Sequence, residues 1–394
     1  MPAASQHVLI AGAGIFGVTA ALELRRRGHR VTLLDPEPPP APRAASTDVS
    51  KVVRREYGSD GEYLRLGGEA IAGWRRWNAQ WRQPLYHQDG VLLLAGRSLD
   101  EEGYEGNSWR ALLAAGCRPE RLAPRQLAGR FPAWRPERYR DGFFHAEGGW
   151  VESGRVVARL LGRARDAGVT RLGGEGMAAL LAGDRAVAGV RTTSGREIAA
   201  DHVVVAAGAW TGRLLGLDGL WATAHPVFHL RPARPQLFAA ERFPVFLADV
   251  AATGWYGFPL HPREGIVKVA RHALGRRVDP DVPRTVAPGD EEALRAFLRQ
   301  SLPALADAPL AGSRSCLYCD TADGHFWIDR DPEREGLTVA SGGSGHAFKF
   351  APLLGGWIAD AVEGVAAPAL GRFRWRRAAG PWAGEEEARA QGVE

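Results

Sequence analysis

The sequence predicts an α/β protein in which a domain built on a parallel sheet is interleaved with a second domain. A short apolar strand, a glycine-rich turn and a helical pattern stand at the N-terminus, which is the order found in nucleotide-binding sheets. Apolar strands that end in small residues recur over 201–210 and 337–345, so the chain leaves this sheet and returns to it. A length of 394 residues also favours two domains over one core.

The N-terminal segment carries a dinucleotide-binding pattern. Residues 7–11 predict a buried strand, 15–27 a helix, and 30–34 a second strand that ends in Asp35. Gly12 permits the tight turn, Gly14 lets the backbone approach a pyrophosphate, and Gly17 lets the helix lie close to the strand. The helix N-terminus offers N–H groups to the phosphates, and Asp35 can accept hydrogen bonds from ribose. A glycine-rich turn in an unrelated parallel sheet is the alternative. The pattern does not separate FAD from NAD, although its extreme N-terminal position favours FAD.

The rest of the chain alternates between helical and strand patterns without an internal repeat. Helices are expected over 61–81, 153–168, 290–302 and 352–363, and Asp290 is expected to cap the third. Strands are expected over 90–95, 201–206, 266–270 and 337–340, with a hairpin over 189–198. The stretch 99–139 predicts irregular structure with short helical pieces. Residues 381–394 are polar and acidic and predict a loosely ordered tail.

Composition and charge exclude several classes of protein. The chain has no window of eighteen apolar residues, so no membrane span is expected. Its N-terminus lacks the pattern of a secretory signal, which favours the cytoplasm, and three cysteines do not make a disulfide framework. The formal charge of +5 comes from scattered arginines, which fits a small acidic substrate better than a nucleic acid.

Lysine is rare in this chain: only three of its 50 basic residues are lysines, namely Lys51, Lys268 and Lys349. Lysine presents a compact charge whose pKa shifts readily with its surroundings, whereas arginine presents a planar guanidinium that stays charged. The three lysines therefore mark positions where an ammonium group is needed, or they survive by chance. Each of them lies in a segment that has other features of a functional site.

The chain resembles the D-amino-acid-oxidase-like flavoprotein superfamily, and within it the sarcosine oxidase and N-methylamino-acid oxidase branch. The resemblance covers residues 7–370 and rests on four segments: GAGIFG at 12–17, KVVR at 51–54, GWYGFP at 254–259 leading to Lys268, and the run from Cys316 to GSGHAFKF at 343–350. It implies an FAD-binding domain of the glutathione-reductase type, which we expect over 1–80, 145–215 and 315–380. A substrate domain on a mixed or antiparallel sheet is then expected over 81–144 and 216–314.

The resemblance also implies roles for individual residues. Cys316 would carry FAD through a thioether to the flavin 8α carbon. Lys268 would lie over the flavin ring and support the reaction with O2, because a cation stabilises the negative charge that O2 acquires. Arg54 and Lys349 would clamp the substrate carboxylate. Further residues would line the substrate cavity or contact the flavin: Tyr256, Tyr318 and His272 in the cavity, and Lys51, Gly343, Gly345, His346 and Lys349 at the flavin.

Other interpretations of these residues remain open. Cys316 and Cys319 could form a redox disulfide, half of a zinc site, or two plain buried thiols. The charged residues could be solvated, and the aromatic residues could belong to the core. We expect no metal ion.

The expected reaction is oxidation of the C–N bond of a secondary amino acid, with O2 as the acceptor and an imine and hydrogen peroxide as products. We expect a monomer that acts on a small substrate. Lys51 and its lead-in resemble the fructosyl-amino-acid oxidases and the imino-acid-oxidising enzymes of secondary metabolism, and Trp255 is a bulky residue expected beside the cavity. Both features argue against sarcosine itself. A dehydrogenase and a non-catalytic flavin-binding subunit are the remaining alternatives.

Overall fold

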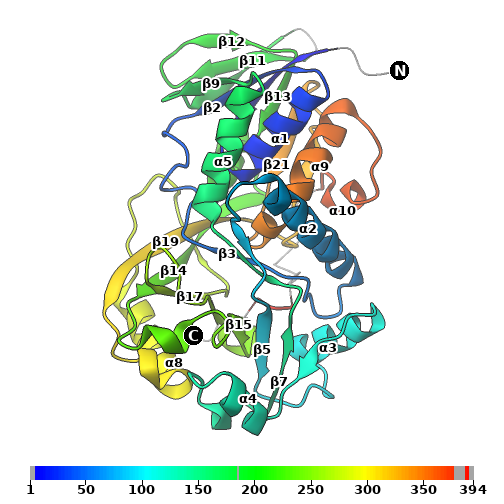
Figure 1. Cartoon of the computed structure of the whole chain (residues 1–394). Coiled ribbons are helices and arrows are strands. Elements are labelled where there is room, and N and C mark those ends of the chain that lie inside the picture. The colour runs from blue at the N-terminus through cyan, green and yellow to red at the C-terminus, as the bar shows by residue number, and fades with distance from the viewer. Residues whose placement is uncertain (1–4, 184–185, 377–386, 390–394) are drawn as a thin grey trace.

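The computed structural model describes residues 5–183, 186–376 and 387–389 (Figure 1). One half of the molecule is built on a six-stranded sheet in the order β20-β21-β13-β1-β2-β9, in which β20 is antiparallel to β21 and the other neighbours run parallel. The strands are β1 (His7–Ala11), β2 (Arg30–Asp35), β9 (Thr170–Gly173), β13 (His202–Val205), β20 (Trp327–Arg330) and β21 (Leu337–Ser341).

This sheet is covered on both faces, which explains why β1 is apolar at nearly every position. Val8 and Ile10 pack into the core formed with three helices, whereas Leu9 and Ala11 face a small antiparallel sheet. The helices are α1 (Ile15–Arg26), α5 (Ser153–Asp166) and α9 (Ala351–Glu363), which lie side by side in Figure 1. The small sheet consists of β10 (Met177–Ala182), β11 (Val187–Thr192) and β12 (Glu197–Ala199).

The other half of the molecule is built on a nine-stranded mixed sheet. Its order is β18-β14-β17-β16-β15-β5-β7-β6, and β19 pairs with β14 along almost its whole length. The strands are β5 (Val91–Ala95), β6 (Glu120–Arg121), β7 (Asp141–His145), β14 (Leu220–Leu230), β15 (Val245–Ala248), β16 (Trp255–Gly257), β17 (Val267–Arg271), β18 (Arg276–Arg277) and β19 (Leu310–Thr321). Helix α8 (Pro288–Ser301) packs on one face through Leu294 and Phe297. Helix α3 (Tyr104–Ala114) contributes Tyr104 and Leu112 to the core on the other face.

A short antiparallel sheet and a long helix lie between these two halves. The sheet consists of β3 (Lys51–Val53), β8 (Gly149–Val151) and β4 (Tyr86–His87). Helix α2 (Gly61–Gln80) begins after Asp60, whose side chain accepts a hydrogen bond from the Tyr63 N–H and caps the first turn. The remaining short helices are α4 (Pro124–Arg130), α6 (Thr211–Leu215), α7 (Val250–Thr253) and α10 (Leu370–Phe373).

The predicted mixture of helices and strands is confirmed, and one detail differs. Asp290 does not cap α8, because the helix already begins at Pro288 and the Asp290 carboxylate instead accepts a hydrogen bond from the Ala287 N–H. The stretch 99–139 contains two short helices, α3 and α4, which agrees with the expected helical pieces. The expected domain boundary at 315 falls inside β19, whose pairing with β14 carries Cys316 on the larger sheet.

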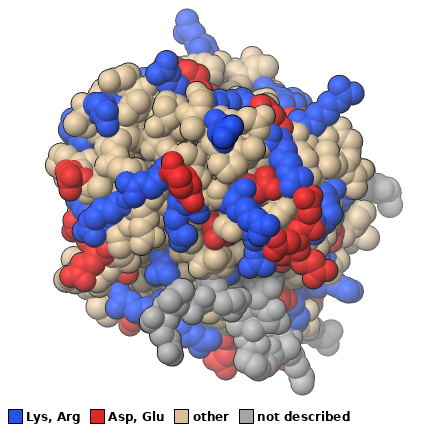
Figure 2. All heavy atoms as spheres, turned by 90° about the horizontal axis from the view of Figure 1, so that it is seen from below, with Lys and Arg blue, Asp and Glu red and all other residues tan. Residues whose placement is uncertain are grey.

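The surface carries charges of both signs. Figure 2 shows basic and acidic side chains intermixed on the face seen from below. Among the described residues, no helix has the length and apolarity required to cross a membrane.

Candidate active site

The glycine turn after β1 has the geometry that its sequence predicts. Gly12 has a φ of +107°, and a Cβ there would lie 2.4 Å from the Ala206 carbonyl oxygen. A Cβ on Gly17 would lie 1.8 Å from the Gly12 carbonyl oxygen, so helix α1 can pack this close only with glycine at that position. Gly14 is the N-cap of α1. The turn therefore presents the start of a long helix to the outer edge of the parallel sheet.

The loop from Ser46 to Ser50 lies beside this turn and fits a bound dinucleotide. Ser46 Oγ accepts a hydrogen bond from the Ile15 N–H at 3.0 Å, which fixes the loop to the first turn of α1. Thr47 Oγ1 and Ser50 Oγ are buried without a hydrogen-bond partner among the described residues. Asp35 ends β2 and accepts hydrogen bonds from the backbone of Ala13 and Glu37. Buried hydroxyls that still need partners, next to a glycine turn and an acid, fit a bound dinucleotide such as FAD.

Cys316 and Cys319 lie on opposite faces of β19, because residues three apart on a strand point in opposite directions. Cys316 packs with Tyr318, and its Sγ lies 3.9 Å from Lys51 Nζ. Cys319 packs in the core next to the six-stranded sheet, where burial raises the pKa of its thiol to about 11. Both cysteines are free thiols. This geometry contradicts the interpretation of the pair as a redox disulfide or as two ligands of one zinc ion.

Lys268 is buried on β17 and is held by an acid that the sequence did not single out. Its Nζ donates to Asp48 Oδ2 at 2.5 Å and to the Ser50 carbonyl oxygen at 2.7 Å. Burial lowers the pKa of Lys268 to about 8, although Asp48 opposes the shift. Burial would raise the pKa of Asp48, but Lys268, together with His229 and Lys51, holds it well below its usual range. Burial therefore gives Lys268 an unusually low pKa, and Asp48 holds its ammonium group in place.

Arg54 and Lys349 meet at the ring of Tyr57, which neither the motifs nor the resemblance indicated. Arg54 lies 4.7 Å and Lys349 Nζ 4.9 Å from the centre of that ring. Lys349 Nζ also donates to Tyr57 Oη at 2.7 Å, and Arg54 Nη1 donates to Tyr104 Oη at 2.8 Å. Both cations are almost fully buried. Two positive groups on one wall of a cavity form a site for an anionic group.

The cavity next to these two cations contains most of the residues expected there. Its walls include Lys51, Arg54, Tyr256, His272, Tyr318, Gly345, His346 and Lys349. Lys268 does not line the cavity itself. Its Nζ lies 4.7 Å from the centre of the ring of Phe258, which is a lining residue. Gly343 packs near Phe16. The structure therefore gathers residues from five distant segments around one space.

Close packing explains two of the lining residues. Gly345 has a φ of +77°, and a Cβ there would lie 2.1 Å from the Tyr318 ring. His346 bonds Tyr57 Oη through Nδ1 and the Gly324 carbonyl oxygen through Nε2, so it connects the glycine loop to the wall that holds the cations. Burial, with a smaller contribution from Tyr256, raises the pKa of Tyr318 well above its usual range. The Tyr318 phenol therefore stays protonated.

One expectation about the surroundings of the cavity is wrong, and a second differs in the few residues that the structure describes. Trp255 points away from it and stacks on Phe297 at 5.2 Å, because its neighbour Tyr256 takes the cavity face of β16. Part of the C-terminal tail is also ordered: Ala388 lines the cavity, and Arg389 is buried with its guanidinium on Asp320 at 2.7 and 3.1 Å. The other residues of 381–394 lie outside the described part of the chain.

Comparisons with known proteins agree with this architecture. The family model for FAD-dependent oxidoreductases (DAO) matches residues 7–361. Human peroxisomal sarcosine oxidase is 30% identical over 88% of this chain and 89% of its own length, and N-methyl-L-tryptophan oxidase of Salmonella arizonae is 29% identical over 94% and 98%. The structure of a fructosamine oxidase from Aspergillus fumigatus, Amadoriase II, superposes with a TM-score of 0.85 at 27% identity and covers 98% of this chain and 94% of its own. The chain therefore belongs to the DAO family of FAD-dependent oxidoreductases.

Proposed function

We propose that the protein is a flavin-dependent oxidase that acts on the C–N bond of an N-substituted amino acid. The observation that carries this proposal is the cavity that Arg54 and Lys349 line together with Tyr318, which lies on the same strand as Cys316. The relatives named as sarcosine and N-methyl-L-tryptophan oxidases support the same class of substrate. In each of those names the substrate is a secondary amine that carries a carboxylate.

The side chains of the cavity would bind and orient the substrate. Arg54 and Lys349 would hold its carboxylate through charge-assisted hydrogen bonds from two directions. This contact fixes one end of a small molecule, so the carbon next to nitrogen is presented in one orientation. Tyr256, Tyr318 and His272 line the same cavity and would shape the space left for the rest of the substrate. We assign none of these three as an essential base.

FAD would bind along the Gly12–Gly17 turn, the Ser46–Lys51 loop and Cys316. When bound, FAD supplies the acceptor for a hydride equivalent from the substrate carbon and passes the two electrons to O2, which leaves as hydrogen peroxide. The imine product is hydrolysed by water. The ammonium group of Lys268 would stabilise the negative charge that O2 acquires.

We further propose that Cys316 attaches the flavin covalently. Acid precipitation of the native protein should leave the yellow colour in the pellet, and C316S should release it into the supernatant. C319S is the matched control, because its thiol lies on the opposite face of β19, and it should behave as the native protein does. Complete release of flavin from the native protein would contradict the attachment.

The activity is tested by hydrogen peroxide production in air from a panel of N-methylated, cyclic and glycated amino acids. Each substrate is paired with the amine that lacks its carboxylate. We expect peroxide from at least one amino acid and at least tenfold less from its decarboxylated partner, because Arg54 and Lys349 then lack an anion to bind. A flavin-loaded protein that yields no peroxide with any member of the panel would support a dehydrogenase or a non-catalytic subunit.

A glycated amino acid is the second candidate substrate. The superposition on Amadoriase II supports it, as does Lys51, which lies on the cavity wall with its Nζ 4.0 Å from Asp48 Oδ2. The same panel separates the two candidates by the ratio of their rates. We also propose that the protein acts as a monomer, which sedimentation of the holoenzyme would test.

A further inference from the structure

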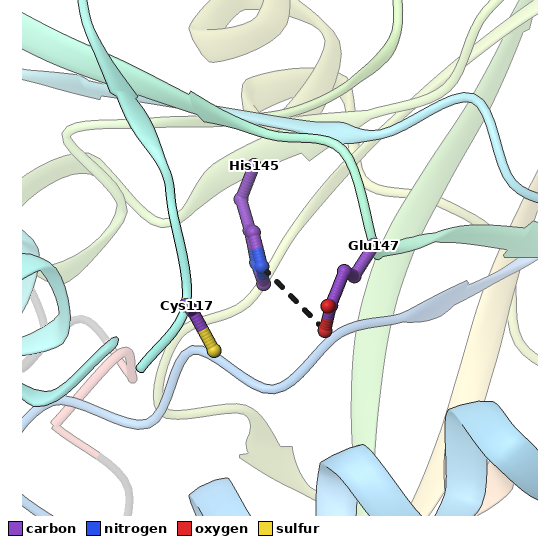
Figure 3. Close-up of side chains that lie close together, drawn as sticks. All are labelled: Cys117, His145 and Glu147. Atoms are coloured by element: carbon purple, nitrogen blue, oxygen red, sulfur yellow. Dashed lines mark ion pairs between the residues drawn. The ribbon is translucent and has the colours of Figure 1, made fainter. Parts of the chain in front are cut away.

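A second group of reactive side chains lies outside the candidate active site. Cys117 follows helix α3, His145 ends β7, and Glu147 lies in the turn before β8. Figure 3 shows the three side chains pointing toward a common space. One potential ligand atom from each, a sulfur, a ring nitrogen and a carboxylate oxygen, lies within 4.8 Å of the others. Cysteine, histidine and glutamate all belong to the small set of side chains that bind zinc.

His145 is oriented as a metal-binding histidine is. Its Nδ1 lies 2.5 Å from Glu56 Oε1, and this carboxylate is fully buried. Its Nε2 faces Glu147 Oε2 at 3.8 Å and is buried without a hydrogen-bond partner among the described residues. Metal-bound histidines commonly donate the second ring N–H to a carboxylate, which fixes the ring and raises the basicity of the ligating nitrogen. The pairing with Glu56 therefore leaves Nε2 directed at the space between Cys117 and Glu147.

A competing cation is also present. Arg55 Nη1 lies 3.1 Å from Glu147 Oε2. The Glu147 side chain is 44% exposed and Cys117 is only partly buried, so both can turn without disturbing the core, and an ion can enter from solvent. A divalent ion that draws the three ligands to bond lengths of about 2.0 to 2.3 Å would replace Arg55 as the partner of Glu147.

We propose that Cys117, His145 and Glu147 form a binding site for a divalent transition-metal ion of the zinc class. The mixed set of soft sulfur, imidazole nitrogen and carboxylate oxygen favours Zn²⁺ over Mg²⁺ or Ca²⁺, which prefer oxygen ligands alone. Water completes the tetrahedron. The Cys117 thiol loses its proton to solvent when the Zn–S bond forms, so binding releases a proton.

The site has a structural consequence for the cavity. Arg55 and Glu56 directly follow Arg54, and Tyr104 Oη joins the Glu56 carbonyl oxygen to Arg54 Nη1 at 2.9 and 2.8 Å. A metal that holds His145 and Glu147 would therefore stiffen the segment that carries Arg54. This consequence rests on the proposed function, whereas metal binding itself does not.

The test is metal binding by the untagged holoenzyme after treatment with a chelator. Zn²⁺ is titrated in competition with a chromophoric chelator, and Co²⁺ is added separately to detect its thiolate bond by absorbance. We expect one equivalent of Zn²⁺ per chain, release of protons, and a Co²⁺–thiolate band. C117S should abolish all three, and C319S, which replaces a thiol elsewhere in the core, should leave them unchanged.

Two further variants distinguish a built site from chance proximity. E56Q should weaken Zn²⁺ binding by about 10- to 100-fold, which is the usual effect of losing the carboxylate partner of a ligating histidine. R55M should strengthen binding, because it removes the cation that competes for Glu147. Circular dichroism checks that each variant is folded, and C117S replaces a partly exposed residue where folding is least at risk. Absence of stoichiometric Zn²⁺, or binding that C117S leaves unchanged, would overturn the proposal, and neither result depends on oxidase activity.

Discussion

Two of the three lysines, Lys268 and Lys349, are almost fully buried near the cavity but are held by different groups. Lys268 forms an ion pair with Asp48 at 2.5 Å and lies against the ring of Phe258. Lys349 donates to the phenol of Tyr57 and lies over the ring of the same residue. A buried carboxylate accepts a hydrogen bond from the first ammonium group, and a phenol accepts one from the second.

This difference separates two uses of the same side chain. A lysine that carries its own counter-ion contributes a local charge without attracting a ligand, and its pKa can be tuned by burial. The second lysine lines the cavity together with an arginine, and two cations side by side can bind an anionic group. We therefore expect variants at the Asp48–Lys268 pair to affect stability and the reaction with O2, and variants around Lys349 to affect substrate binding.

Replacement of Asp48 should have the largest effect on stability. Asp48→Ala leaves the Lys268 ammonium group buried without its counter-charge, and breaking a buried pair in this way costs about 3 to 5 kcal/mol. The free energy of unfolding in urea, followed by tryptophan fluorescence, measures the loss. Glu197→Ala is the matched control, because its pair with Arg191 lies on the surface and such pairs contribute less than about 1 kcal/mol.

A double variant tests the reason for this loss. Lys268→Met in the Asp48→Ala background removes the unpaired charge, so the double variant should be more stable than Asp48→Ala alone. If the two losses simply add, the ion pair is not the cause.

Lys349→Met should lower kcat/KM for the amino-acid substrate by about 10- to 100-fold. A hydrogen bond to a charged group contributes about 1.5 to 3 kcal/mol, and about 1.4 kcal/mol corresponds to a factor of ten. The measurement is the rate of flavin reduction by substrate without O2. Lys268→Met is the matched comparison: it should leave this rate nearly unchanged and slow the reoxidation of the reduced protein by O2. Equal loss of both half-reactions in either variant would contradict the separation of roles.

The reaction with O2 should depend on pH through Lys268. Burial lowers the pKa of this group from its ordinary value near 10.5 to about 8, so the folded protein loses the charge as the pH rises through 8. The rate constant for reoxidation should therefore fall by up to about tenfold per pH unit above 8. Lys268→Arg keeps its charge at every working pH and should remove the decline. A decline that persists in this variant would assign the titration to another group.

The lowered pKa of Lys268 should make the free energy of unfolding rise with pH, whereas the rate of reoxidation falls. Between pH 8 and 10.5 the unfolded chain still binds a proton at Lys268 that the folded protein has released. The free energy of unfolding rises with pH wherever the unfolded state binds more protons. The contribution of Lys268 to this free energy should therefore increase steadily from pH 8 to pH 10.5.

Contiguous parts of the fold could be predicted from the sequence, and residues brought together by long-range pairing could not. The turn from Gly12 to Gly17 and the acid at Asp35 follow local rules, because one strand, one turn and one helix determine where they lie. Asp48 and Lys268 are 220 residues apart, and nothing in either segment indicates the other. The resemblance placed Lys268 near the flavin but did not give the acid that holds it.

Strand alternation and loop packing explain the remaining errors. The spacing of Cys316 and Cys319 is typical of a metal-binding or redox pair. Because both lie on one strand, their side chains face opposite sides of the sheet. Trp255 and Tyr256 are neighbours in sequence, and the same alternation sends only the second into the cavity. The cluster of Cys117, His145 and Glu147 could not be predicted from the sequence. Its residues come from a loop, a strand end and a turn, and only the larger sheet brings them together. The polar and acidic composition of the tail predicted loose order, yet Arg389 forms an ion pair with Asp320 in the interior.

Tyr57→Phe should have the smallest effect and the most specific meaning. The change keeps the ring beneath Lys349 and Arg54 but removes the hydroxyl that bonds Lys349 Nζ at 2.7 Å and His346 Nδ1 at 3.0 Å. The hydroxyl bonds a charged ammonium group but does not itself bind the substrate, so only part of the roughly 1.5 to 3 kcal/mol of such a bond should appear in KM. We expect KM to rise by about two- to tenfold while reoxidation by O2 stays unchanged. Tyr63→Phe is the matched control, since Tyr63 stacks on Tyr57 at 4.8 Å and its hydroxyl bonds His325. If Tyr57→Phe slowed reoxidation as well, the two lysines would act on one shared charge, because the phenol near one of them would then affect the chemistry assigned to the other.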